Sequence, residues 1–133
     1  MSKKIMFAIT LLLSGRAMTL AFIHRVGGNM PGDPPAAWLM PLIGDAIIGI
    51  TGLFIAYLIL KKVGLWAWTA IVVWNALAIW DALAAYTIHL TNPWPEFFMI
   101  QMAGSSMFFM ASAMHLVVLL LSCSKEVRKQ MLG

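Results

Sequence analysis

The sequence predicts an all-α integral membrane protein, a four-helix up-down-up-down transmembrane bundle. Hydrophobic residues make up 62% of the chain and charged residues only 11%, whereas ordinary soluble domains carry about 25% charged residues. The apolar runs between the charged clusters are long enough to cross a bilayer core, which takes about 20 residues in a helix. They show no alternation of period two, so strands are excluded. We therefore expect a single transmembrane domain over residues 1–133.

Four apolar segments are predicted to be the transmembrane helices. They are residues 5–24, 38–60, 65–90 and 97–122. The first segment has the basic start and apolar run of a signal peptide, but Arg16 interrupts the run where a signal peptide stays apolar. We therefore expect it to be retained as the first helix.

The connections between these segments predict how the helices are arranged. Residues 25–37 form the one long loop, and they are rich in Gly and Pro, which favour turns over helix. The connections at 61–64 and 91–96 are short. Short links join antiparallel neighbours in helix bundles, so an up-down-up-down order is expected.

The positive charge predicts the orientation in the membrane. Seven of the basic residues would share one side of such a bundle: Lys3, Lys4, Lys61, Lys62, Lys125, Arg128 and Lys129. The excess of positive charge marks the cytoplasmic side, so both termini are expected there. The net charge of +4 is then explained by topology, and we expect no nucleic-acid partner. We expect the membrane to be a bacterial inner membrane, with its lipids as partners.

Charged residues inside the predicted helices mark the candidate site. Counted from the outer helix ends, Arg16, Asp45 and Asp81 lie about 10–14 Å deep, and Ser105 and Ser106 lie at a similar depth. A charge at the bilayer centre costs about 3 kcal/mol on insertion scales, so these groups should face inward and pair. Two carboxylates against one guanidinium leave one negative charge in excess.

Other polar and aromatic residues are candidates for the surroundings of this layer. They are Trp74, Asn75, Trp80, Gln101, Ser105, Ser106 and His115. Gln101 and the two serines would add hydrogen bonds, and one of the two tryptophans would form a wall. Asn75 and His115 fall deeper in the membrane, where hydrogen bonding between helices is the simpler interpretation.

Three functions are compatible with this pattern. Ionisable groups inside a membrane indicate by default a functional site, so we first expect binding of a small lipophilic or amphipathic ligand, or of a proton or ion, from the outer-leaflet side. One alternative is an accessory or assembly subunit of a larger membrane complex, or a homo-oligomer, in which the polar layer only fixes helix register. A second alternative is an acid–base isomerase of a lipid-soluble substrate, with Asp45 and Asp81 as catalytic groups.

The sequence predicts no cofactor and no metal site. The single cysteine, Cys123, excludes an intramolecular disulfide and a CxxC motif. His24 and His89 would both lie at the outer interface, which leaves haem or a metal there as an alternative. No paired ligand spacing favours that alternative, and no known catalytic motif is present.

Overall fold

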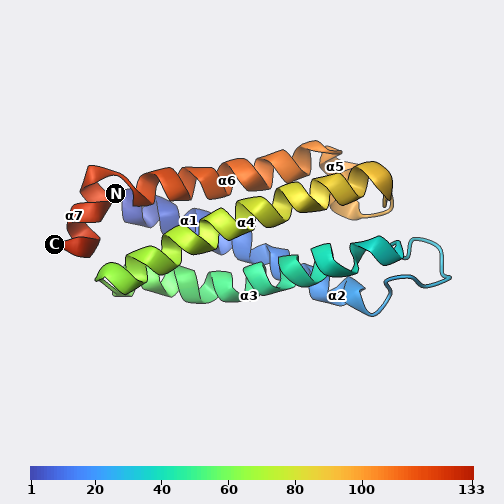
Figure 1. The fold of residues 1–133 in the computed structure, drawn as a ribbon, viewed down its shortest axis with the longest axis horizontal. Helices are drawn as coiled ribbons and strands as arrows, with labels where there is room; N and C mark the ends of the chain where they lie inside the picture. The colour runs from blue at the N-terminus through green and yellow to red at the C-terminus, as the bar shows by residue number, and fades with distance from the viewer.

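The computed structural model describes residues 1–133, and the chain is all-helical, without strands. Its elements are α1 (Ser2–Leu13), the 3₁₀ helix η1 (Ser14–Thr19), α2 (Leu20–Ile23), the 3₁₀ helix η2 (Ala36–Trp38), α3 (Leu39–Lys61), α4 (Leu65–Thr91), α5 (Phe98–Ala103), α6 (Ser106–Ser122) and α7 (Lys125–Leu132). The molecule is elongated, and both termini lie at one end, called here the termini end (Figure 1). The loop after α2 lies at the opposite end, called here the loop end.

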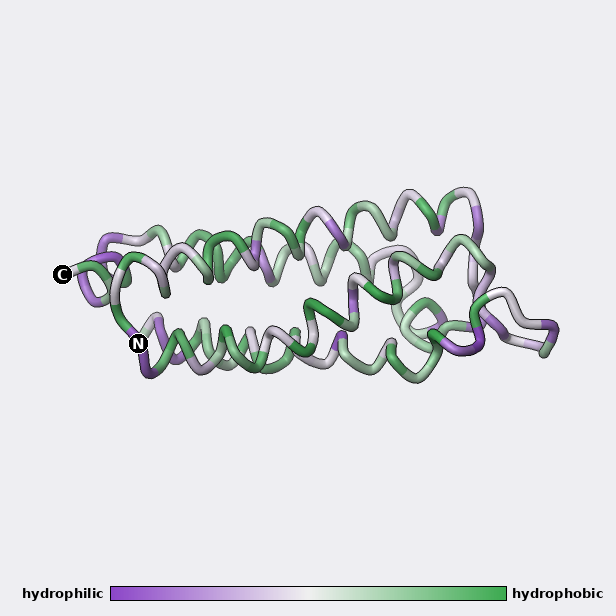
Figure 2. Tube along the Cα trace, turned by 60° about the horizontal axis from the view of Figure 1, so that its bottom comes forward, coloured by the Kyte–Doolittle hydropathy of each residue, from purple (hydrophilic) through white to green (hydrophobic).

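Three helical segments are long and apolar enough to cross a membrane: Ser2–Ile23, Ala36–Lys61 and Leu65–Thr91. α6 has 17 residues and becomes a fourth candidate only when it is counted together with α7, from which it is bent by 63°. Apolar residues run along the long helices, and hydrophilic residues gather mainly at their ends (Figure 2). By length and composition, the chain therefore has three or four helices that could cross a membrane.

The helical segment at the N-terminus packs more closely on α3 than on α6. α1 contacts both α3 and α6, whereas η1 and α2 contact α3 and have no backbone neighbour in α6. Glycines of α3 permit the close approach, because a Cβ on Gly49 would lie 2.0 Å from the backbone nitrogen of Ala17. The segment expected as one helix over residues 5–24 thus contains a 3₁₀ stretch where it meets α3.

The apolar core has two parts, and the charged residues lie between them. One cluster fills the termini end and includes Val127 and Met131 of α7, which closes that end. The other is an aromatic cluster at the loop end, formed by Trp38, Trp94, Phe97 and Phe108 with their neighbours. In α3 and α4 the two aspartates occupy the boundary between these clusters.

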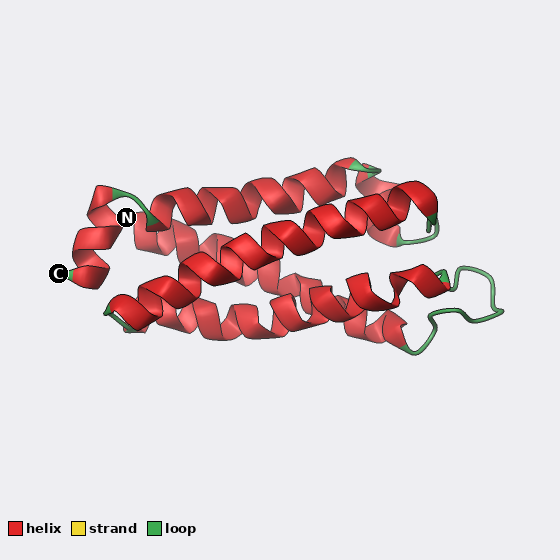
Figure 3. Ribbon diagram, viewed as in Figure 1, coloured by secondary structure: helices red, strands yellow, loops and turns green.

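Two loops connect the helices at the loop end (Figure 3), and side chains hold these connecting segments by hydrogen bonds. Trp94 Nε1 donates to the Gly32 carbonyl at 2.9 Å, and Arg25 Nε donates to Asp33 Oδ1 at 2.8 Å. The hydrogen bond from Arg25 is the main reason why the pKa of Asp33 lies below its ordinary value. Nearby, the segment expected as one helix over residues 97–122 is interrupted at Gly104, whose φ of +59° ends α5.

Candidate functional site

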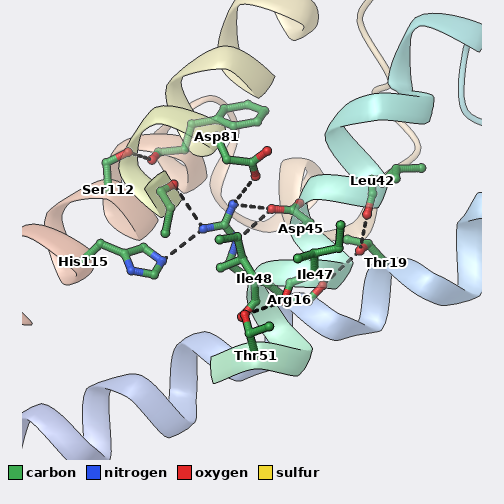
Figure 4. A network of polar contacts seen from close by, with 12 residues as sticks. Arg16, Thr19, Leu42, Asp45, Ile47, Ile48, Thr51, Asp81, Ser112 and His115 are labelled. Carbon is green, nitrogen blue, oxygen red and sulfur yellow. Dashed lines mark hydrogen bonds and ion pairs between the residues drawn. The ribbon is translucent and has the colours of Figure 1, made fainter. Parts of the chain in front are cut away.

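The candidate site is centred on the side chain of Arg16, which belongs to η1 (Figure 4). Its side chain is only 11% exposed. Arg16 Nε donates to Asp45 Oδ1 at 2.7 Å, and Nη2 donates to the same oxygen and, at 2.6 Å, to Asp81 Oδ2. One guanidinium from the first helical segment therefore pairs with carboxylates from α3 and α4.

The other edge of the guanidinium faces α4 and α6. Arg16 Nη1 donates to the Ala78 carbonyl at 3.3 Å and contacts His115 Nε2 at 3.0 Å. A guanidinium has five N–H groups and no acceptor, so His115 Nε2 must be the acceptor of this bond. The ring proton is then on Nδ1, which donates to Asn75 Oδ1 at 3.0 Å. His115 is neutral in this arrangement, and every N–H group of Arg16 has a partner.

The two aspartates retain unused acceptors. Asp45 Oδ2 and Asp81 Oδ1 accept no hydrogen bond from the protein, because the contacts with Arg16 use the other oxygen of each carboxylate. The side chains of Asp45 and Asp81 are 19% and 22% exposed. With both carboxylates ionised and His115 neutral, the network carries one negative charge in excess.

Asp45 and Arg16 line a cavity of about 90 Å³. The cavity lies between η1 and α6, whose backbones do not contact each other. Apart from Thr19, the rest of its wall is apolar and includes Phe97 and Phe108. A larger groove of about 450 Å³ shares part of this wall and continues along the first helical segment and α6. Its lining contains Arg16 as the one charged residue, so an apolar path leads from the protein surface to the ion network.

Asp81 lines a different groove, of about 610 Å³, between α3 and α4. Trp80 stands at the edge of this groove with 76% of its surface exposed. Trp80 is therefore not a wall of the cavity beside Asp45. Asp45 and Asp81 thus line separate spaces, although their carboxyl groups lie within hydrogen-bond reach of each other beside Arg16.

Trp74 and Asn75 lie behind the ion network and position His115. The Trp74 ring contacts the imidazole edge-on with a centroid distance of 5.0 Å, and its Nε1 donates to Thr51 Oγ1 at 3.0 Å. Asn75 Nδ2 donates to the Ile71 carbonyl at 2.9 Å, which orients the amide oxygen that receives the His115 proton. These residues fix the imidazole rather than line the cavity.

The other candidates from the sequence lie outside the network. Gln101, Ser105 and Ser106 are exposed, and Ser106 Oγ donates to the carbonyl of Ala103 in the preceding turn. The helix break at Gly104 means that depth along the chain does not fix the direction of these side chains. His24 is exposed, whereas His89 packs against Phe108 at a centroid distance of 5.4 Å. No group of three or more His, Cys, Asp and Glu residues is placed to hold a metal ion.

Thr19 belongs to the site, although it is not among the candidates predicted from the sequence. It is buried and lines the cavity. Its Oγ1 lies 3.0 Å from both the Arg16 and the Leu42 carbonyl oxygens and so ties η1 to α3 next to Asp45. A signal was available, because Thr19 follows Arg16 by one turn and falls on the same face. The apolar wall residues carry no such signal, since they have the spacing of any packed helix.

The network consists of a guanidinium whose N–H groups all have partners, a neutral imidazole, and two carboxylates that each keep one oxygen without a hydrogen bond. Such a set binds a proton, a cation or a hydrogen-bond donor better than an anion, because no N–H group of Arg16 is free. Comparison of the chain with known protein families, with curated proteins and with solved structures finds no match.

Proposed function

We propose that the chain crosses a membrane four times, as an up-down-up-down bundle with both termini in the cytoplasm. The termini, α7 and the Lys62–Gly64 connection share the termini end, and seven of the nine Lys and Arg residues belong to that end. The positive-inside rule then makes the loop end the outer end. A bacterial inner membrane is the setting in which we expect this arrangement.

Within this topology, we propose that the protein binds a small lipophilic molecule with a positively charged or hydrogen-bond-donating group, taken from the outer-leaflet side. The observation that carries the proposal is the free Oδ2 of Asp45, in a residue that lines an otherwise largely apolar cavity. An anionic group would have to break an ion pair to reach Arg16, whereas a donor would find this acceptor unused. A proton satisfies the same oxygen and is the smallest such ligand.

The two adjoining spaces suit the two parts of such a ligand, a polar head group and a lipophilic tail. The cavity of about 90 Å³ suits a small head group, and the apolar groove of about 450 Å³ suits a hydrocarbon tail. Methionines are frequent in the groove, and their flexible side chains adapt to irregular apolar ligands. The ligand would enter sideways from the bilayer, between the first helical segment and α6.

The isomerase alternative has less support than binding. Catalysis by Asp45 and Asp81 together would need one substrate to contact both carboxylates. They line separate grooves and share Arg16 between them. The accessory-subunit alternative needs no ligand in the cavity. The following experiment distinguishes it from the binding proposal by whether the protein carries a bound molecule.

The test is native mass spectrometry of the purified protein in mild detergent, with a visible absorption spectrum of the same sample. We expect a stoichiometric added mass that is lost in Ala111→Phe, because this side chain would fill the cavity and the groove without removing a charge. Ala113→Phe is the matched control, since Ala113 is exposed on the same helix and lines neither space. Asp45→Asn should also lose the mass. A protein without added mass, or a mass that Ala111→Phe retains, would contradict the proposal and favour the subunit alternative.

A further inference from the structure

The groove between α3 and α4 is not used by the proposed function. It has a volume of about 610 Å³ and runs from Ala37 to Ile47 on one side and from Trp80 to Ile88 on the other. At 1.5 Å per residue these stretches are about 12–15 Å long, which is two to three helical turns. The groove is therefore long and open, and its shape matches the side of a third helix better than a compact molecule.

Asp81 lines this groove with one carboxylate oxygen that receives no hydrogen bond. Arg16 bonds to Asp81 Oδ2, and Oδ1 has no partner in the protein. Asp81 lies ten residues before the end of α4 at Thr91, about 15 Å into the helix. An acceptor without a donor is unfavourable among acyl chains at such a depth. An occupant with a positive charge would remove this cost and would bring the charge of the whole network to zero.

The walls of the groove allow a helix backbone to come close to Asp81. Gly44 lies at the level of the carboxylate, and its lack of a side chain makes room for Asp81 itself, since a Cβ there would lie 2.1 Å from Asp81 Oδ1. Ala84 and Ala85 continue the small surface along α4, and small residues allow close packing of transmembrane helices. Trp80 stands exposed beside Asp81, well inside the span, whereas tryptophans in membrane proteins are enriched at the interfaces. A packed partner would cover this ring.

A second copy of the chain does not supply the missing charge. Arg16 is the one Lys or Arg inside the candidate spans away from their ends, and all of its N–H groups are used. Acyl chains have no donor at this depth. We propose that the α3–α4 groove docks a transmembrane helix of a different protein, which carries a Lys or Arg side chain at mid-membrane depth opposite Asp81.

The test uses a defined probe rather than an unknown partner. A synthetic Leu/Ala peptide of about 20 residues with one central Lys is compared with the same peptide carrying a central Leu, both in phosphatidylcholine vesicles. Energy transfer is measured from a dye on Cys123, which is the one cysteine of the chain and is exposed. We expect the Lys peptide to bind at least about tenfold more tightly than the Leu peptide, a difference of about 1.4 kcal/mol.

Variants of the groove make the test specific. Ala84→Phe should abolish binding of the Lys peptide, because Ala84 lines the groove and does not touch the ion network. Ala113→Phe and Ala111→Phe, which lie outside the groove, should leave it unchanged. Asp81→Asn should reduce the affinity for the Lys peptide to that for the Leu peptide. If this variant does not fold, the effect of Ala84→Phe alone shows whether the peptide binds in the groove.

Three results would overturn the inference. Equal binding of the two peptides would show that charge plays no part, and binding that survives Ala84→Phe would place the contact elsewhere. Self-association of the protein without peptide, abolished by Ala84→Phe, would assign the groove to a second copy. None of these results bears on the ligand mass that Ala111→Phe should remove, so the two proposals fail separately.

Discussion

The residues around Arg16 divide into those that satisfy the guanidinium and those that remain free to act. Both aspartates, the Ala78 carbonyl and His115 together use its five N–H groups. The free oxygens belong to the aspartates alone. Loss of Arg16 should therefore affect stability first, whereas changes at the free oxygens should affect binding.

Arg16→Gln should lower the free energy of unfolding by about 3 kcal/mol, because it leaves two largely buried carboxylates without their cation. The triple variant Arg16→Met/Asp45→Asn/Asp81→Asn should recover most of this loss, since no charge is then stranded. Unfolding in mild detergent, followed by circular dichroism, measures both. Ser106→Ala is the control, because Ser106 is exposed and lies outside the network. Equal stability of Arg16→Gln and the parent protein would show that the ion pairs contribute nothing to the fold.

The common depth of Arg16, Asp45 and Asp81 could be read from the sequence, because a charge is conspicuous in an apolar helix and its depth follows from counting. The bond to the Ala78 carbonyl and the neutral form of His115 could not, since they depend on the rotation of each helix about its axis. Ser105 and Ser106 show the same limit. They lie at the counted depth, but the break at Gly104 separates them from the network.

At the scale of elements, the contact between η1 and α3 places the site. A 3₁₀ run of six residues is long for this kind of helix, since runs beyond three or four residues are uncommon. It occurs where the backbone of Ala17 lies against Gly49. The sequence shows a line of small residues along α3, formed by Gly49, Gly52 and Ala56. It does not indicate the 3₁₀ winding, because the two helix types differ little in dihedral angles and tertiary contacts decide between them.

Gly49→Ala tests this contact, and Gly15→Ala is its matched control. The new Cβ at position 49 would lie 2.0 Å from the Ala17 nitrogen, so η1 must move away from α3. We expect a loss of about 1–3 kcal/mol of unfolding free energy, typical of an overpacked core. A Cβ added at Gly15 would meet nothing within 4 Å, and Gly15 has no positive φ, so Gly15→Ala should be neutral or stabilise by about 0.4–1 kcal/mol. Equal effects of the two substitutions on thermal unfolding would contradict the close approach.

At the scale of the whole molecule, the chain is all-helical, and seven of its nine Lys and Arg residues lie at the termini end. Composition and the length of the apolar runs predict the all-helical class, because these properties do not depend on tertiary contacts. The turn into α7 and the break between α5 and α6 could not be predicted with the same ease. α7 turns back because Val127 and Met131 pack into the termini end, and Gly64 N donates to the Met131 carbonyl at 2.6 Å.

The proposed orientation gives the two ends different access to reagents, and the single cysteine reports on it. Cys123 is exposed between α6 and α7 at the termini end. If the proposed orientation holds, a membrane-impermeant maleimide should leave Cys123 unlabelled in intact bacterial cells and label it in inside-out vesicles, because the positive-inside rule assigns the end rich in Lys and Arg to the cytoplasm. The variant Cys123→Ser/Asn29→Cys should show the reverse pattern, since Asn29 is exposed in the loop at the other end. Labelling of Cys123 in intact cells, together with protection of the cysteine at position 29, would place the termini outside. The cavity beside Asp45 would then open toward the inner leaflet, and the proposed source of the ligand would change with it.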